Sequence, residues 1–322
     1  MTTKNWSIRE STAPALYGDL LEQKHLLIAG ATGSGKSVVI EGMLYYLSYS
    51  NPGDIPGGKN CYLIDPKRVE LSQWKKIPHC IGYASEPGAI VNALRDLMGI
   101  CENRYIQMQA EGIKKYNGSD IYLFIDEFAD LMTTNKKETA PIIQRLAQIG
   151  RAAKIHVILA TQTPIAKILP TEIKCNFDAR LGLRTRSAQD SRNILDMCGL
   201  ENLPPFGEGF VLLPGIQKYF DHCTIVNATR PRKEVLADYI RQGGFIVQIP
   251  MIPADAVRSI IEQWERQYIQ YLPDQYIKIN GKTEYQNAMI KYCPMDPGAT
   301  SPGRTRKRSR LKELIDRLER LP

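Results

Sequence analysis

Short apolar runs alternate with longer amphipathic segments along most of this chain. The amphipathic segments carry apolar residues at helical spacing, as Ile90, Leu94 and Leu97 do, which predicts helices over 38–50, 87–112 and 137–153. The short runs are typical of strands that are buried on both faces of a parallel sheet. They lie at residues 25–29, 60–65, 121–125, 156–161, 179–183 and 209–213. The alternation predicts an α/β domain whose mostly parallel sheet is flanked by helices on both faces.

This alternation fades after about residue 226. Helical spacing predicts further helices over 234–241 and 253–271, and Asn280-Gly281 is a typical hairpin turn within a tyrosine-rich stretch. A segment rich in proline and arginine then precedes leucines at helical spacing, which predicts a linker and an amphipathic tail helix. We therefore expect an α/β domain over 1–232, a small, mostly helical C-terminal extension over 233–297, and a basic linker with its tail helix over 298–322.

The clearest chemical signal follows the first apolar run. The segment Gly30-Ala-Thr-Gly-Ser-Gly-Lys36-Ser37 matches the phosphate-binding motif G-x-x-x-x-G-K-[ST], and a predicted helix follows it as the motif requires. Backbone N–H groups of such a loop surround the phosphates, the lysine reaches the β and γ phosphates, and the hydroxyl ligates Mg²⁺. The expected nucleotide contacts are Gly30, Ala31, Thr32, Gly33, Ser34, Gly35, Lys36 and Ser37.

Two adjacent carboxylates end another apolar run. Asp126 and Glu127 directly follow the five apolar residues 121–125, at the end of a strand where ligands of open α/β sheets bind. A P-loop enzyme needs one carboxylate in the Mg²⁺ shell and a second group to polarise the attacking water. We expect Asp126 and Ser37 to hold the metal and Glu127 to act as general base. In isolation, such an acidic pair could instead cap the helix that follows.

Composition excludes several other classes of protein. The chain has 322 residues, of which 43% are hydrophobic and 24% charged, values typical of globular proteins. Its apolar runs are too short to span a bilayer, and residues 1–20 lack the apolar core of a secretory signal. We expect a cytoplasmic chain without an integral membrane segment. Seven cysteines without a C-x-x-C pair argue against a zinc site or a disulfide framework.

Net charge is a weak pointer toward nucleic acid. The chain carries +8, and residues 298–322 hold eight basic and three acidic residues, which accounts for +5 of it. The rest of the chain is therefore only mildly basic. The tail combines this cationic run with a predicted helix, so the helix could dock a protein partner while the basic run holds DNA or an anionic membrane surface. Alternatively, the tail could simply solubilise the chain and cap its own assembly.

Over about residues 25–226 the chain resembles the motor domain of the FtsK/SpoIIIE DNA translocases, within the FtsK and HerA group of P-loop ATPases. Matching blocks accompany the phosphate loop in the family's order. They are Ile64-Asp-Pro-Lys-Arg-Val-Glu-Leu-Ser72, Ile77-Pro-His79, Asp126-Glu-Phe-Ala-Asp-Leu-Met132, Arg145-Leu-Ala-Gln, Gly150-Arg-Ala-Ala, Ala160-Thr-Gln162 and Asp190-Ser-Arg192. The resemblance implies a RecA-like ATPase that binds ATP and Mg²⁺ and forms a hexameric ring that moves double-stranded DNA.

The resemblance also implies further site residues. Gln162 corresponds to the family's polar sensor of the γ phosphate, and Arg151 to an arginine finger that reaches the site of a neighbouring subunit. From the residues alone, Arg151 could equally pair with an acid at the end of its own helix. Residues expected to touch DNA, from the loops after Ala-Thr-Gln and around Asp-Ser-Arg, are Lys167, Lys174, Arg184, Arg186 and Arg192. They could also be ordinary solvated charges.

Some positions depart from the family pattern. Thr163 replaces a frequent arginine and Ala188 a frequent lysine, and only 29 residues precede the loop, which implies a short form without the N-terminal membrane anchor. We expect an ATP-driven DNA translocase of a phage or other mobile element, acting in transfer, segregation or packaging. The alternative is an ATP-binding DNA clamp or coupling adaptor that recruits a partner such as a relaxase. A small-molecule kinase would leave Ala160-Thr-Gln162 unexplained.

Overall fold

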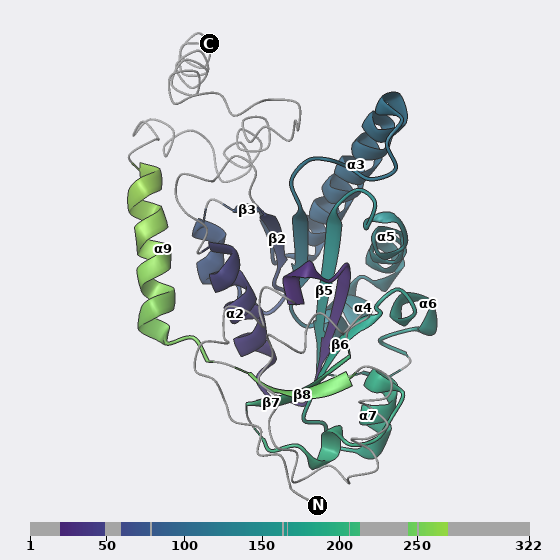
Figure 1. The fold of residues 1–322 in the computed structure, drawn as a ribbon, viewed down its shortest axis with the longest axis vertical. Helices are drawn as coiled ribbons and strands as arrows, with labels where there is room; N and C mark the ends of the chain where they lie inside the picture. Colours follow the sequence, from purple (N-terminus) through teal and green to yellow (C-terminus); the bar gives the residue numbers. More distant parts are fainter. Residues whose placement is uncertain are drawn as a thin grey trace, which may run out of the picture.

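A computed structural model describes residues 20–48, 59–77, 79–162, 164–165, 167–205, 207–212, 244–249 and 251–269. These residues form a layered α/β body (Figure 1). The predicted helix at 234–241, the hairpin near Asn280-Gly281, and the linker and tail helix over 298–322 lie outside the described residues.

An eight-stranded sheet forms the middle layer, in the order β3-β2-β4-β5-β1-β6-β7-β8. Strands β1 to β6 pair in parallel, and β7 is antiparallel to both of its neighbours. The predicted α/β class with a mostly parallel sheet is therefore confirmed. The strands are β1 His25–Ala29, β2 Asn60–Ile64, β3 Cys80–Ala84, β4 Ile121–Ile125, β5 Ile155–Thr161, β6 Ala179–Leu183, β7 Glu208–Leu212 and β8 Gly244–Gln248.

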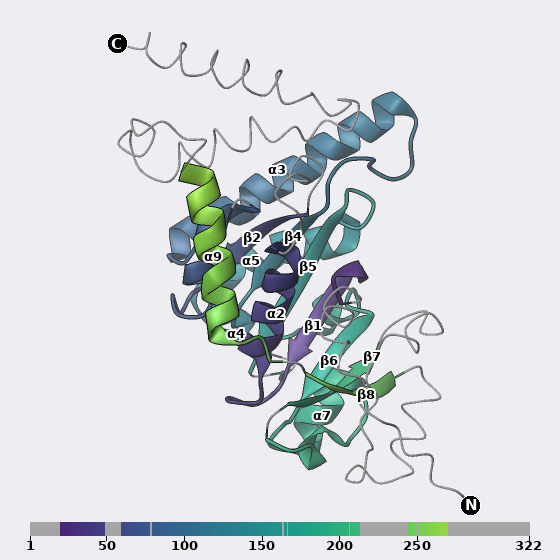
Figure 2. The same cartoon turned by 60° about the vertical axis from the view of Figure 1, so that its left-hand side comes forward.

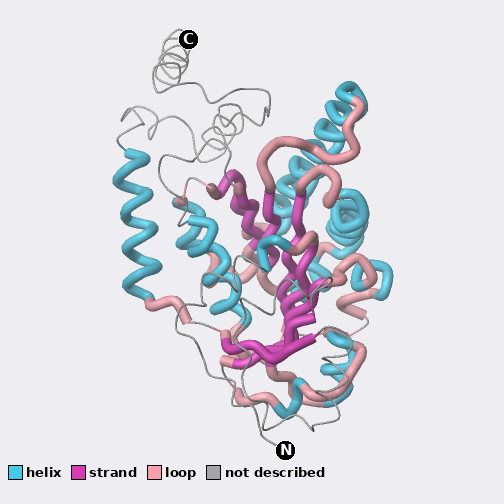
Figure 3. The backbone as a smooth tube through the Cα atoms, in the orientation of Figure 1, coloured by secondary structure: helices cyan, strands magenta, loops and turns pink. Residues whose placement is uncertain are grey.

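Helices cover both faces of this sheet, as Figure 3 shows in cyan around the magenta strands. One face carries α2 Lys36–Ser48, the short 3₁₀ helix η2 Ser72–Lys76 and α9 Ala254–Ile269, and Figure 2 shows α9 beside α2. The opposite face carries α3 Pro87–Glu111, α4 Phe128–Thr134, α5 Lys136–Ile149, α6 Thr171–Lys174, α7 Ala188–Leu195 and η3 Leu200–Asn202. No described helix combines the length and apolar character that crossing a membrane requires.

The strands feed two cores because their side chains alternate between the faces. In β4, Tyr122 and Phe124 belong to the core beneath α2, whereas Leu123 and Ile125 belong to the core beneath α3 and α5. All five residues of β4 are buried. Burial on both faces explains why these strands appear in the sequence as unbroken apolar runs.

Two strands escaped the sequence analysis. Strand β3 contains Gly82, where a Cβ would come within 2.4 Å of the Tyr62 ring, and two of its five residues are only half buried. Its apolar signal is therefore diluted. Strand β8 begins at Gly244, shortly after the helix predicted over 234–241 and where no strand was expected, and its pairing with β7 extends the sheet.

The first part of the predicted C-terminal extension packs with the α/β body. Besides β8 in the sheet, Val257, Ile260 and Ile261 of α9 belong to the same core as α2. The boundary expected after residue 232 thus separates segments that share one core. Helix α5 also differs from prediction, because it ends at Ile149 and the following residues 150–154 form a turn.

Leu123→Ala should lower the free energy of unfolding by about 2–5 kcal/mol, because it leaves a cavity in a fully buried strand. Val69→Ala is the control, since the Val69 side chain is 68% exposed and its loss should change stability by less than about 0.5 kcal/mol. Urea unfolding followed by circular dichroism measures both. Equal losses for the two variants would contradict the assigned core.

Candidate nucleotide site

The phosphate loop lies at the carboxyl end of β1, between the ends of β5 and β6. The Gly30 N–H donates to the Thr161 carbonyl at 3.3 Å, and the Ala31 N–H donates to the Arg184 carbonyl at 2.8 Å. Position 30 admits only glycine, because a Cβ there would lie 2.7 Å from the Leu183 Cβ. The loop is therefore held against both neighbouring strands.

Lys36 opens α2 and folds back onto the loop. Its ammonium donates to the carbonyls of Gly30 and Ala31, each at 2.8 Å, and only 6% of the residue is exposed. Burial lowers the pKa of Lys36 to about 8, although the charges of Glu127 and Asp126 favour the protonated form. The side chain is thus a cation at neutral pH, within reach of a phosphate bound by the loop. Ser37 follows in the first turn of α2, half buried.

Buried carboxylates gather at the same edge of the sheet. Asp126 follows β4 and Asp65 follows β2, and their exposed fractions are 6% and 0%. Burial, together with the charges of Asp65, Glu70 and Glu127, raises the pKa of Asp126 to about 6 despite the opposing effect of Lys67. One oxygen of Asp65 accepts the Leu71 N–H at 3.0 Å, while Asp65 Oδ1 is buried without a hydrogen-bond partner.

This donor set fits a divalent cation. A cation would relieve the mutual repulsion of the buried carboxylates and lower the pKa of Asp126. Among the described residues, no three His, Cys, Asp or Glu side chains converge to hold a metal by themselves. Mg²⁺ does not need such a cluster, because it is usually bound by one or two protein ligands together with substrate phosphates.

Glu127 connects three segments of the chain. Its Oε1 accepts the Gln162 N–H at 3.1 Å and the Thr161 hydroxyl at 3.5 Å, and its Oε2 pairs with the Lys67 ammonium at 3.1 Å. The residue has φ +56°, a left-handed conformation that costs energy for a residue with a Cβ. Lys67 and Asp65 were not predicted as site residues. The block Ile64–Ser72, which contains both, was the sequence signal that could have identified them.

Gln162, which directly follows β5, also lies at the phosphate loop, because its Oε1 accepts a hydrogen bond from the Thr32 hydroxyl at 2.7 Å. The fold thus brings Lys36, Asp126, Glu127 and Gln162 to the carboxyl ends of β1, β4 and β5. These are four of the five residues that the sequence analysis expected to be catalytic.

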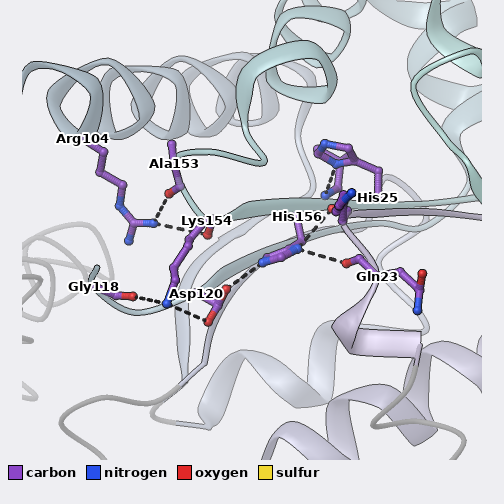
Figure 4. A network of polar contacts seen from close by, with 10 residues as sticks. Gln23, His25, Arg104, Gly118, Asp120, Ala153, Lys154 and His156 are labelled. Atoms are coloured by element: carbon purple, nitrogen blue, oxygen red, sulfur yellow. Dashed lines mark hydrogen bonds and ion pairs between the residues drawn. The ribbon is translucent and has the colours of Figure 1, made fainter. Parts of the chain in front are cut away.

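The fifth residue, Arg151, lies at the opposite edge. It is exposed in the turn before β5, and that strand of seven residues separates it from Gln162 by about 20 Å. Arg151 lines a cavity of about 450 Å³ together with Asp120, Lys154 and His156. Figure 4 shows Asp120 between the other two, 2.8 Å from His156 Nε2 and 3.8 Å from Lys154 Nζ. The structure gives Arg151 no ion pair with a described residue.

The five cations expected to touch DNA fall into different environments. Lys174 pairs with Asp196 at 2.6 Å and its side chain is only 17% exposed, so it is not a free surface charge. Lys167 and Arg192 are exposed, and Arg192 donates to the Cys198 sulfur at 3.0 Å. Arg184 and Arg186 are exposed as well, but they line cavities that the phosphate loop borders.

Comparison with known proteins identifies relatives of this chain. The FtsK/SpoIIIE family model matches residues 8–122 and 118–166. The DNA translocase FtsK of Listeria monocytogenes is 31% identical over 339 residues, covering 97% of this chain and 42% of that protein. The DNA translocase FtsK of Chlorobaculum tepidum is 41% identical over 213 residues, covering 60% and 26%. The chain spans less than half the length of these relatives.

Solved structures share the fold. The pCW3 conjugation coupling protein TcpA, a monomer with ATPγS, has a TM-score of 0.57 at 23% identity, covering 76% of this chain and 66% of that one. Two ATPase domains of EssC from Geobacillus thermodenitrificans give a TM-score of 0.59 at 14% identity, covering 79% and 46%. At these identities the likeness concerns the fold alone.

Asp126→Asn should stabilise the folded protein above pH 6 in buffer without magnesium and nucleotide. Between 3.8 and about 6 the folded state binds more protons at this carboxyl than the unfolded state, so stability falls as pH rises through that window. Removing the charge should restore about 3 kcal/mol at pH 7 and much less at pH 4. Urea unfolding measures this, with the exposed Asp96→Asn as control. A destabilised Asp126→Asn protein at pH 7 would contradict the proposed repulsion.

Proposed function

Because the chain belongs to the FtsK/SpoIIIE family, we propose that it hydrolyses ATP and uses the energy to move double-stranded DNA. The observation that carries this proposal is the convergence at one sheet edge of the phosphate loop, Lys36 and the buried carboxylates Asp126 and Glu127. A cation for the phosphates beside a potential metal ligand and a base is the equipment that phosphoryl transfer to water needs.

Each residue has a definite task in this proposal. Backbone N–H groups of residues 30–37 bind the phosphates, and Lys36 exchanges its two carbonyl acceptors for β- and γ-phosphate oxygens. Ser37 and Asp126 hold Mg²⁺, which neutralises charge on the phosphates when it is bound. Glu127 orients the attacking water and accepts its proton, while Gln162, tied to Thr32, contacts the γ phosphate.

The arginine finger acts between subunits. Arg151 and the phosphate loop lie at opposite edges of the sheet, so Arg151 cannot complete the site of its own chain. We propose a ring, with six subunits as in the family pattern, in which each Arg151 reaches the ATP of a neighbour. There it stabilises the charge that develops on the transferred phosphoryl group.

DNA is held through phosphate contacts rather than base edges. Lys167, in the loop after β5, and Arg192, on α7, are exposed cations suited to this role. Lys174 is better explained by its ion pair with Asp196. A role in a mobile element and a protein partner for the tail stay predictions.

The first test combines turnover and mass. Purified protein should hydrolyse ATP slowly alone and at least tenfold faster with linear double-stranded DNA, and light scattering should give a hexameric mass when both ligands are present. Lys36→Ala should lose turnover more than 100-fold, because the phosphates lose their cation. Turnover that ignores DNA, or a fully active Lys36→Ala protein, would contradict the proposal.

The second test asks whether the site is shared. Arg151→Ala should bind ATP like the wild type and lose about 10³-fold in turnover. Glu127→Gln should also be inactive, yet mixing the two variants should restore activity, since some interfaces then combine an intact Arg151 with an intact Glu127. The matched control is a mixture of Glu127→Gln with Lys36→Ala,Arg151→Ala, in which no interface is complete. Absence of recovery at every ratio would count against a finger from the neighbouring subunit.

A further inference from the structure

Two arginines lie beside the phosphate loop. Arg184 and Arg186 line a cavity of about 410 Å³ that the loop segment from Ala31 to Ser34 also lines. Arg186 also lines a second cavity of about 170 Å³, which reaches Thr32 and Gln162. The first half of the phosphate loop thus shares its cavities with two arginines of its own chain.

The backbone fixes both arginines in this position. The Arg184 carbonyl accepts the Ala31 N–H at 2.8 Å, which joins the end of β6 to the loop. Thr185, between the two arginines, is 4% exposed, and its N–H donates to the Leu200 carbonyl at 3.3 Å. Because Thr185 is anchored inward, its two neighbours project from the surface next to the loop.

Neither arginine side chain has a partner among the described residues. Within the described residues the structure gives Arg184 and Arg186 no side-chain hydrogen bond or ion pair, whereas Lys174 and Arg180 both pair with Asp196. The two acids that border the cavities are already engaged. Glu201 accepts the Gly199 N–H at 2.8 Å, and Asp190 accepts the Ser187 hydroxyl at 2.9 Å.

We propose that Arg184 and Arg186 bind the nucleoside triphosphate held by their own subunit, rather than DNA. This inference rests on the proposed ATP site and deepens it. An arginine presents several N–H donors to phosphate oxygens, and such charge-assisted hydrogen bonds are stronger than those between neutral groups. Arg186 reaches the cavity of Gln162, where the γ phosphate is expected, so it favours the triphosphate over the diphosphate.

Calorimetric titration of the full chain with ATPγS and ADP tests this assignment, together with DNA binding measured by fluorescence anisotropy. Arg184→Ala and Arg186→Ala should each weaken ATPγS binding by about tenfold, the loss expected for one charge-assisted hydrogen bond. Arg186→Ala should weaken ADP binding less. DNA affinity measured without nucleotide should change less than threefold. The control, Lys137→Ala, removes an exposed cation of α5 that lines neither cavity and has no part in the proposed sites, and it should leave ATPγS binding unchanged.

Thermal unfolding would verify that each variant folds, and Arg186→Lys, which keeps the charge, should recover part of the affinity. Wild-type protein that fails to bind ATPγS would overturn the ATP site itself. Wild-type protein that binds, with both arginine variants binding equally well, would overturn only this inference. Loss of DNA affinity in those variants would then assign the two arginines to DNA binding instead.

Discussion

Two backbone hydrogen bonds hold the phosphate loop between strands that are far apart in the sequence. The Gly30 and Ala31 N–H groups donate to carbonyls at the ends of β5 and β6, so the loop cannot move independently of either strand. Gln162, Arg184 and Arg186 follow those two strands and are therefore fixed relative to Lys36. A β1 strand between β5 and β6 is the sheet arrangement that makes this contact available.

The buried carboxylates of the site lower the free energy of unfolding of the protein. Asp126, Asp65 and Glu127 are buried close together, and among the described residues Lys67 alone forms an ion pair with this group, so the negative charges repel one another. Glu127 adds the cost of a left-handed backbone. The unbroken apolar strands on both sides of the site offset these costs. The stability of the surrounding sheet keeps these carboxylates buried together despite their repulsion. A bound cation that accompanies the ligand would relieve that repulsion.

Local sequence patterns predicted the strands and site residues that depend only on adjacent residues of the chain. Buried strands such as β4 are unbroken apolar runs, and Asp126 and Glu127 directly follow one, so both the strand and the acids were visible. Strand β3, whose apolar run contains Gly82, and β8, which begins at Gly244, lacked that signal. Pairings across the fold were also hidden. Lys174 meets Asp196 and Lys67 meets Glu127 only after the chain has folded, so no spacing rule could connect them.

The same topology separates the two halves of the proposed chemistry. In parallel strands all carboxyl ends lie at one edge, which gathers the loop, the carboxylates and Gln162, while the turns that enter the strands lie at the other. Arg151 occupies such an entering turn before β5. An arginine there is removed from its own site by the length of a strand, whatever its rotamer. In the proposed ring, Arg151 of one subunit would complete the site of its neighbour, so hydrolysis would depend on assembly. Arg184 and Arg186, as proposed above, would supply the positive charge that a single chain can provide for its own nucleotide.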